Sequence, residues 1–155
     1  MPSIPQRARA MAEIRLAVLK ALDAIAEIEE KSFSTPWSRD SLRDGIEDDR
    51  YCFIVLDVDG KAVGYGSILP ILDECDLLNL AILPEHRGKG YGKELLSALI
   101  TEAKGRGAAV MHLEVRQSNE RAIGLYRSFG FEVDGIRKNY YKMPLENAVL
   151  MTKTL

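Results

Sequence analysis

The most constraining feature of this chain is a short segment in which an apolar run, a basic glycine-rich loop and an amphipathic helix follow one another. The apolar run, residues 77–83, is typical of a buried strand, and Pro84 ends it. The loop reads His-Arg-Gly-Lys-Gly-Tyr-Gly-Lys over residues 86–93, and leucine and isoleucine then recur at helical spacing over residues 95–100. A strand that leads through a loop into a helix predicts a layered domain of sheet and helices.

The loop itself indicates a phosphate-binding site. A helix N-terminus carries unpaired N–H groups and a partial positive charge, glycines let an anion approach this backbone, and basic side chains add charge. It is not a Walker A loop, because Arg87 stands where the first glycine belongs and Glu94 follows Lys93. It is not a dinucleotide fingerprint either, because Lys93 replaces the last glycine. The alternative is a solvated, flexible connection without a ligand.

The rest of the chain alternates between strand and helix patterns. Further strands are expected over residues 14–18, 51–56, 61–69, 110–116, 131–136 and 148–153. Further helices are expected around residues 22–28, after Ser38 and after Asn119. The order β-α-α-β-β-β-α-β-α-β-β predicts an α/β (α+β layered) fold with helices on the faces of a mixed sheet. We expect one domain over residues 13–155, preceded by a flexible tail over residues 1–12.

Composition excludes several classes of function. The 155 residues have the length of one domain, and a formal net charge of −2 gives no basic footprint for nucleic acid. The two cysteines and two histidines form no CxxC or HExxH pattern, so neither a disulfide framework nor a metal site is expected. No apolar run approaches the roughly 18 residues of a membrane span, and the first ten residues lack the apolar core of a secretory signal. We therefore expect a cytoplasmic protein without nucleic-acid or membrane partners.

The loop and several other motifs resemble one enzyme family. Arg87-x-x-Gly90-x-Gly92 after an apolar strand resembles the pyrophosphate motif of the GNAT N-acetyltransferases, which bind acetyl-CoA. Five further runs resemble the bacterial and archaeal ribosomal-protein-alanine acetyltransferases, the RimI group: LDE at 72–74, NLAI at 79–82, LEVRxSN at 113–119, AIxLY at 122–126 and RKNYY at 137–141. The resemblance covers roughly residues 14–155. It implies the GNAT fold, with a central mixed, mostly antiparallel sheet flanked by helices.

The resemblance also implies a binding site for acetyl-CoA as cosubstrate. The backbone of Leu80, Ala81 and Ile82 is expected to hold the pantetheine arm and the acetyl carbonyl. The loop amides from Gly88 through Lys93 are expected to hold the pyrophosphate. The complete set of expected cofactor-binding residues is Leu80, Ala81, Ile82, Arg87, Gly88, Lys89, Gly90, Tyr91, Gly92, Lys93 and Asn119.

Acetyl transfer to an amine requires that the amine lose a proton, that the oxyanion of the tetrahedral intermediate be stabilised, and that the leaving thiolate gain a proton. Glu114 is the expected general base, because carboxylates are ionised near neutral pH and accept protons directly or through water. Tyr126 is the expected general acid, because a phenol keeps its proton at that pH. The resemblance assigns the same roles. The residues alone leave open a surface ion pair of Glu114 with Arg116 or His112, and a core position for Tyr126.

Aromatic residues in two segments are expected to flank an extended peptide. Phe33 and Trp37 lie in one segment, and Tyr140 and Tyr141 lie in the other. The alternative for the first pair is that both rings anchor their loop to the core. The resemblance implies that the acceptor is the N-terminal α-amine of a protein, either ribosomal protein S18 or a broader set of N-termini, and we expect a monomeric enzyme.

The identity of the acceptor is less constrained than the reaction. The chain departs from the family's usual pattern beside the expected peptide entrance, with Glu146-Asn147 before the last strand and Lys142-Met143 before Pro144. A GNAT enzyme that acetylates a small-molecule amine or a lysine side chain is one alternative. A non-catalytic acyl-CoA-binding module is another, although the presence of both Glu114 and Tyr126 argues against it.

Overall fold

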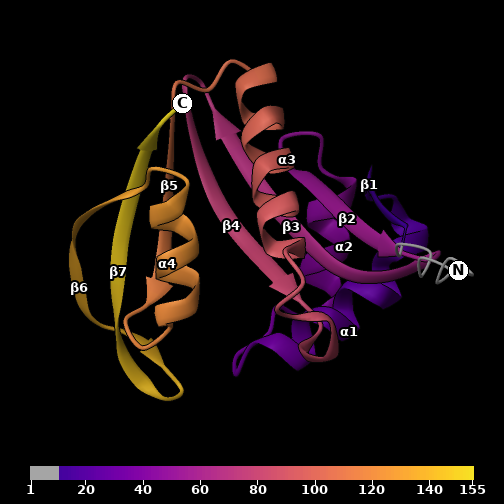
Figure 1. The fold of residues 1–155 in the computed structure, drawn as a ribbon, viewed down its shortest axis with the longest axis horizontal. Coiled ribbons are helices and arrows are strands. Elements are labelled where there is room, and N and C mark those ends of the chain that lie inside the picture. Colours follow the sequence, from indigo (N-terminus) through magenta and orange to yellow (C-terminus); the bar gives the residue numbers. More distant parts are fainter. Residues whose placement is uncertain (1–10) are drawn as a thin grey trace, which may run out of the picture.

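The structure, a computed structural model, describes residues 11–155, and over these residues seven strands form one sheet (Figure 1). The strand order is β1-β2-β3-β4-β5-β7-β6. The strands are β1 (Ala12–Leu16), β2 (Cys52–Val58), β3 (Lys61–Ile71), β4 (Glu74–Ile82), β5 (Val110–Arg116), β6 (Glu132–Lys142) and β7 (Leu145–Thr154). Neighbouring strands are antiparallel except for β4 and β5, which run parallel. The arrangement confirms the predicted α/β fold with a mixed, mostly antiparallel sheet.

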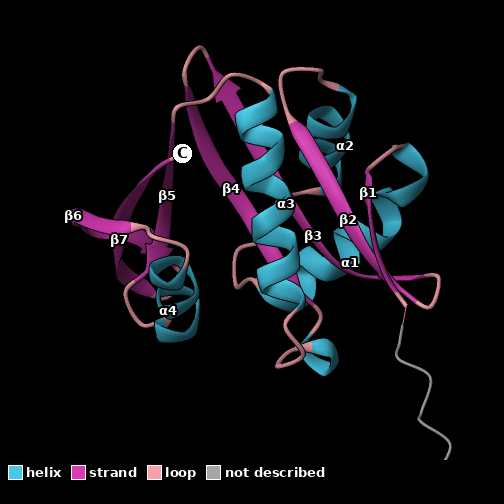
Figure 2. Cartoon of the chain, turned by 45° about the horizontal axis from the view of Figure 1, so that its top comes forward, coloured by secondary structure: helices cyan, strands magenta, loops and turns pink. Residues whose placement is uncertain are grey.

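Helices cover both faces of this sheet (Figure 2). They are α1 (Leu22–Ser32), α2 (Arg39–Glu47), α3 (Tyr91–Gly105) and α4 (Glu120–Ser128), with short 3-10 helices η1 (Leu19–Ala21) and η2 (Pro84–His86). On one face α1 contacts β3 and β4, and on the other face α3 contacts β2, β3 and β4. In both ribbon views α4 lies on the same side as α3, in front of β5. The element order therefore matches the predicted order.

Glycines in β3 let α3 lie close to the sheet. Alternate residues of a strand point to opposite faces, and in β3 Tyr65 points toward α1 while Gly64 and Gly66 face α3. A Cβ atom at Gly66 would lie 2.6 Å from Cδ1 of Leu99, and one at Gly64 would lie 3.1 Å from Cδ1 of Leu95. Both leucines are fully buried. This close packing fixes the height of α3 above β4, and with it the position of the loop that precedes α3.

The parallel strands β4 and β5 pair over a short stretch and then separate. Among the described residues, their pairing is limited to residues 74–76 with residues 110–112. Ile68 of β3 pairs with Leu77 and Ser67 pairs with Asn79, so Leu78 is an extra residue that bulges β4 where the pairing with β5 ends. Figure 1 shows the two strands diverging from this point. The sheet therefore opens between the second half of β4 and the second half of β5.

The hairpin of β6 and β7 is longer than predicted. Strands were expected over residues 131–136 and 148–153, but pairing continues to Tyr141 with Glu146 and Lys142 with Leu145. The added part of β6 is polar and mostly exposed, so it lacks the apolar alternation that marks a strand in sequence. The tip of the hairpin is instead held by a residue far away in the sequence, because Arg116 of β5 donates a hydrogen bond of 3.0 Å to the Pro144 carbonyl.

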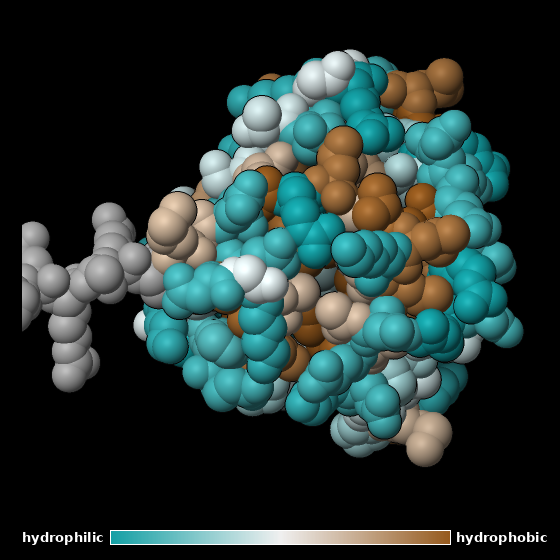
Figure 3. All heavy atoms as spheres, turned by 90° about the vertical axis from the view of Figure 1, so that its right-hand side faces the viewer, coloured by the Kyte–Doolittle hydropathy of each residue, from teal (hydrophilic) through white to brown (hydrophobic). Residues whose placement is uncertain are grey.

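The first strand lies two residues earlier than predicted. It spans Ala12–Leu16 rather than residues 14–18, because Ala12 pairs with Val58 of β2. Figure 3 shows this side of the molecule, where hydrophobic residues gather between hydrophilic ones. Leu16 and Val18 are exposed and contribute no alternating buried face.

Of the tail expected over residues 1–12, the first ten residues lie outside the described part of the chain. No helix formed by residues 11–155 is long and apolar enough to cross a membrane.

Candidate active site

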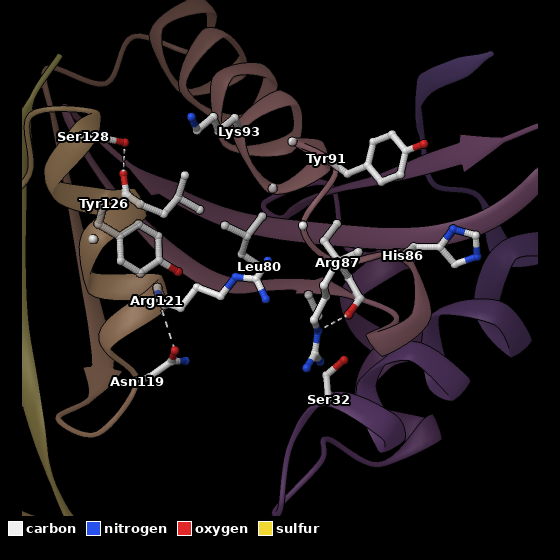
Figure 4. A pocket seen from close by; sticks show the side chains of 18 of the residues that line it. Ser32, Leu80, His86, Arg87, Tyr91, Lys93, Asn119, Arg121, Tyr126 and Ser128 are labelled. Carbon is white, nitrogen blue, oxygen red and sulfur yellow. Dashed lines mark hydrogen bonds between the residues drawn. The ribbon is translucent and has the colours of Figure 1, made fainter. Parts of the chain in front are cut away.

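A cleft of about 640 Å³ lies between the end of β4, the loop before α3, and α4 (Figure 4). The end of α1 contributes Ser32 and Phe33 to it. All of the predicted cofactor residues except Lys89 line the cleft: Leu80, Ala81, Ile82, Arg87, Gly88, Gly90, Tyr91, Gly92, Lys93 and Asn119. The structure thus brings together in one cavity residues that the sequence places in two separate segments.

The loop has the geometry of an anion site. Gly88 and Gly90 have φ angles of +79° and +85°, a conformation that favours glycine. A Cβ atom at Gly90 would meet nothing within 4 Å, so this position requires glycine for its conformation rather than for space. Gly90 caps α3 without a side-chain hydrogen bond, and the first helical bond runs from Glu94 N–H to the Gly90 carbonyl at 3.2 Å. The preceding N–H groups therefore lack helical partners and can bind an anion.

Cations surround this helix terminus. Arg87 donates from Nε to the Ile82 carbonyl at 2.9 Å, which ties the loop to the end of β4. Lys93 lines the cleft from the first turn of α3. Sequence reasoning missed Arg121 of α4, whose Nη2 lies 3.5 Å from the position that a Cβ on Gly88 would take. The sequence shows Arg121 two residues after the Asn119 cap of α4. Only the fold shows that its side chain lies beside the loop before α3.

Asn119 and Tyr126 come to the cleft from α4. The Asn119 side-chain oxygen caps the helix by accepting a hydrogen bond from Ala122 N–H at 3.2 Å, as the sequence predicted. Tyr126 is 7% exposed, packs edge-on against Phe131 at a ring distance of 5.7 Å, and still lines the cleft. Burial, and secondarily the nearby Tyr141, raise the pKa of the Tyr126 phenol above its usual value. A group with a raised pKa keeps its proton to higher pH, as an acid in this position must.

A second hollow of about 480 Å³ lies on the side of the sheet that α1 and α2 cover. It is lined by Trp37 from the α1–α2 loop, by Glu114 of β5, and by Tyr140 and Tyr141 of β6. Glu114 alternates along β5 with buried apolar residues, so its carboxylate leaves the strand on this side. Three of the four aromatic residues expected to flank a peptide therefore lie beside the predicted base. Their fourth member, Phe33, lies in the first cleft instead.

Glu114 forms an ion pair with neither Arg116 nor His112, the two partners that the sequence suggested. Arg137 of β6 donates from Nη1 to Glu114 Oε1 at 3.2 Å. The two suggested partners are engaged elsewhere. Arg116 pairs with Glu146 at 3.2 Å, and His112 lies between Thr152 and Glu74.

Arg116 joins the two loops beside the second hollow. Its guanidinium donates to the Met143 carbonyl and to Ser34 Oγ, each at 3.2 Å, and lies 4.3 Å from the centre of the Tyr141 ring. Ser34 Oγ in turn donates to the Met143 carbonyl at 2.6 Å. The α1–α2 loop and the tip of the β6–β7 hairpin are therefore fastened to each other. Sequence reasoning did not single out this role for Arg116, because its partners lie far away along the chain.

Tyr141 connects the two sides of the sheet. Burial is the main cause that raises the pKa of its phenol to about 12, and the Glu114 carboxylate and Tyr140 add to the rise. The same Tyr141 contributes to the raised pKa of Tyr126 on the other side. Tyr141 therefore lies near enough to influence Tyr126, and near enough to be influenced by Glu114. The predicted acid, Tyr126, lines the first cleft, and the predicted base, Glu114, lines the second hollow.

Comparisons with known proteins agree with this geometry. The profile of the Acetyltransferase (GNAT) family matches residues 22–131. The [ribosomal protein bS18]-alanine N-acetyltransferase of Haemophilus influenzae is 39% identical over 132 residues, covering 83% of this chain and 89% of that protein. The Escherichia coli K12 enzyme of the same name is 38% identical over 132 residues, covering 84% of this chain and 88% of that protein.

Solved structures show the same likeness. The crystal structure of the ribosomal-protein-S18-alanine N-acetyltransferase from Escherichia coli matches with a TM-score of 0.86 at 36% identity, over 93% of this chain and 94% of that chain. The Salmonella typhimurium protein yncA, solved with its cofactor acetyl-CoA, matches with a TM-score of 0.83 at 25% identity, over 94% of both chains.

Proposed function

This chain belongs to the GNAT acetyltransferase family, and on that premise we propose that it transfers the acetyl group of acetyl-CoA to the N-terminal α-amine of a protein. One observation carries the proposal: where β4 and β5 part, an anion-binding cleft borders Leu80 to Ile82 of β4, and an aromatic hollow borders Leu77 and Leu78 of β4 and Glu114 of β5. Two substrates can enter from the two sides and react where the strands part.

The first cleft fits the nucleotide end and the arm of acetyl-CoA. Unpaired N–H groups at the start of α3, together with Lys93 and Arg121, form a donor set suited to a pyrophosphate. The backbone of Leu80 to Ile82 borders the same cleft next to the opening, where a thioester would come to lie. Because β5 no longer pairs with this part of β4, its backbone groups on that side are available to an acyl carbonyl.

The chemistry follows from the two titratable groups at the opening. Glu114 accepts a proton from the attacking amine, directly or through water, as the new C–N bond forms. Tyr126 donates its proton to the sulfur as the C–S bond breaks, which leaves CoA as a free thiol. A backbone N–H near Ile82 stabilises the oxyanion between these two steps. No covalent acetyl-enzyme is required, since direct attack in a ternary complex transfers the group.

The acceptor we propose is an N-terminal alanine of the kind named for the relatives, that of ribosomal protein bS18. An α-amine has an ordinary pKa of about 7.7–8.0, against about 10.4 for lysine, so it loses its proton far more readily near neutral pH. The fastened α1–α2 loop and β6–β7 hairpin, with Trp37 and Tyr141 beside them, provide a path for a chain terminus. This function requires no metal.

The test is thiol release from acetyl-CoA with short peptides whose α-amine is free or blocked. We expect turnover with a free N-terminal alanine and none with the same peptide after α-amine acetylation. A blocked peptide that contains lysine serves as the control for side-chain transfer. Turnover with the blocked lysine peptide would replace this acceptor by a lysine side chain, and binding of acetyl-CoA without turnover of any amine would reject the enzyme reaction.

A further inference from the structure

A buried carboxylate on α1 touches both the strand and the loop that border the reaction opening. Glu29 is 2% exposed and belongs to neither the cleft nor the hollow. The Tyr65 hydroxyl of β3 donates to its Oε2, and Asn79 Nδ2 of β4 lies 3.5 Å from the same oxygen. The Trp37 N–H of the α1–α2 loop donates to its Oε1 at 3.3 Å.

This carboxylate is held by neutral donors. Across residues 11–155, no lysine, arginine or histidine forms an ion pair with Glu29. Burial is the largest influence on its pKa and raises it. An unpaired buried charge costs stability, and apolar side chains often replace buried charges without loss. We therefore look for the role of Glu29 in the groups that its two oxygens contact, rather than in stability.

The first of these groups fixes β4 at its bulge. Asn79 follows the extra residue Leu78 and precedes the backbone that borders the acyl end of the cleft. Its Nδ2 also donates to Tyr65 Oη at 2.6 Å, so Asn79 is tied to both Tyr65 and Glu29. These side chains are buried together between α1 and the sheet. A shift of Glu29 would therefore move β4 at the point where it leaves β5.

The second group is the Trp37 N–H, which belongs to the loop beside the second hollow. Trp37 lines the second hollow together with Glu114 and Tyr141. Its side chain is partly exposed, and its N–H contact to Glu29 holds the α1–α2 loop in addition to the contacts of Ser34 with Met143 and Arg116. One side chain thus contacts, at opposite oxygens, the strand that borders the acetyl donor and the loop that borders the acceptor.

We propose that Glu29 is a positioning residue for acetyl transfer, which holds β4 through Tyr65 and Asn79 and holds the α1–α2 loop through the Trp37 N–H. It touches neither substrate. This proposal rests on the proposed function, because it takes acetyl transfer as the reaction that Glu29 supports. Its geometric part can be measured without turnover, because Trp37 is the single tryptophan of the chain and reports the position of the loop by fluorescence.

Three substitutions test the two contacts together and separately. Glu29→Met keeps the length of the side chain and removes both acceptors. Glu29→Gln keeps an oxygen for the Trp37 N–H but presents an N–H group to Tyr65. Tyr65→Phe removes the hydroxyl link to β4 and leaves Glu29 with Trp37. The matched control is Glu27→Gln on the same helix, where the carboxylate is exposed and pairs with Lys31 at 2.7 Å.

We expect acrylamide quenching of Trp37 to rise clearly in Glu29→Met and to stay near wild type in Glu29→Gln. Loss of hydrogen bonds to a buried charged group predicts about tenfold lower kcat in Glu29→Met, Glu29→Gln and Tyr65→Phe. The peptide KM is expected to rise about fivefold in Glu29→Met alone, where the loop contact is lost. The Kd of acetyl-CoA should change less than twofold in every variant, and Glu27→Gln should match wild type throughout.

Circular dichroism and thermal unfolding establish that each variant is folded at the assay temperature. A folded Glu29→Met protein with unchanged quenching and unchanged kcat would overturn the proposal, as would a kcat in Tyr65→Phe equal to wild type. Wild-type protein without activity on any α-amine would instead overturn the proposed function. In that case Trp37 quenching still decides whether Glu29 holds the loop.

Discussion

The first cleft and the second hollow lie on opposite sides of one sheet and present different chemical groups. The cleft presents backbone N–H groups at a helix terminus, with glycines that let a ligand approach. The hollow presents charged and aromatic side chains, joined by the Glu114–Arg137 ion pair and by the stacking of Arg116 on Tyr141. The cleft depends mainly on backbone N–H groups and on glycines at positive φ, supported by Lys93 and Arg121, whereas the hollow depends on its side chains.

This difference predicts that substitutions divide into two classes. Changes in the loop before α3 should weaken binding of acetyl-CoA and leave the chemical step intact. Changes at the opening or in the second hollow should alter turnover or the peptide KM and leave acetyl-CoA binding intact. Tyr126 is the exception, because it lines the cleft but is proposed to protonate the leaving group.

The largest effect is expected for Tyr126→Phe. Loss of a general acid should lower kcat by about 10² or more, while the Kd of acetyl-CoA stays within twofold. Because the pKa of Tyr126 is raised, the wild-type rate should not fall between pH 8 and pH 10 from loss of this proton. Thiol-release kinetics and calorimetry measure both quantities, with Tyr51→Phe as the matched control. Near-normal turnover in Tyr126→Phe would reject the acid role.

Glu114→Gln comes next. We expect kcat to fall by about 10²-fold and the rising alkaline limb of the rate profile to shift or flatten, because the proton acceptor is gone. Arg137→Gln, which removes the partner of Glu114, should have a smaller effect with the limb retained. An unchanged profile in Glu114→Gln would remove Glu114 from the mechanism.

Gly90→Ala tests the cleft alone. A Cβ in the left-handed conformation costs about 1–2 kcal/mol, which predicts roughly tenfold weaker binding of acetyl-CoA with kcat unchanged at saturation. The matched control is Gly105→Ala in α3, where a Cβ atom meets nothing within 4 Å and no positive φ is involved. A change in kcat at saturating acetyl-CoA would contradict the division between binding and chemistry.

The smallest effect is expected for Arg116→Lys. A lysine keeps the charge but cannot contact Ser34, Met143 and Glu146 at once. The peptide KM should rise about threefold to fivefold while the Kd of acetyl-CoA stays constant, as for loss of weak, partly exposed contacts. Steady-state kinetics at varied peptide concentration measure the change. An increase in the acetyl-CoA Kd alone would contradict the placement of Arg116 on the acceptor side.

The two regions also differ in how far the sequence predicts them. Residues 80–93 form one uninterrupted strand, loop and helix start, so local spacing predicted a phosphate-binding loop in this part of the cleft. The family resemblance added Leu80 to Ile82 and Asn119, whereas Arg121 was missed. The contact between Glu114 and Arg137 spans 23 residues and depends on the register of β5, β7 and β6. No local pattern encodes that register. The polar part of β6 gave no strand signal, and the sequence suggested nearer partners for Glu114.

The buried cluster around Glu29 shows a similar limit. On the sequence alone, Glu29 is one of several acidic residues between the apolar positions of an amphipathic helix. Its burial follows from the packing of α1 on β3 and β4, which brings Tyr65 and Asn79 to it from 36 and 50 residues away. Helical spacing predicted the helix and its apolar face, but not the polar residue that this face buries.

The most direct test of the central claim is amide hydrogen exchange with three ligands: CoA, an N-terminal alanine peptide, and the two joined through an acetyl bridge. We predict that CoA protects residues 87–93 and 119–126, that the peptide protects residues 33–38 and 137–146, and that the conjugate protects both sets at once. Protection of the same residues by CoA and peptide, or a conjugate that protects the CoA set alone, would contradict transfer across the opening between β4 and β5.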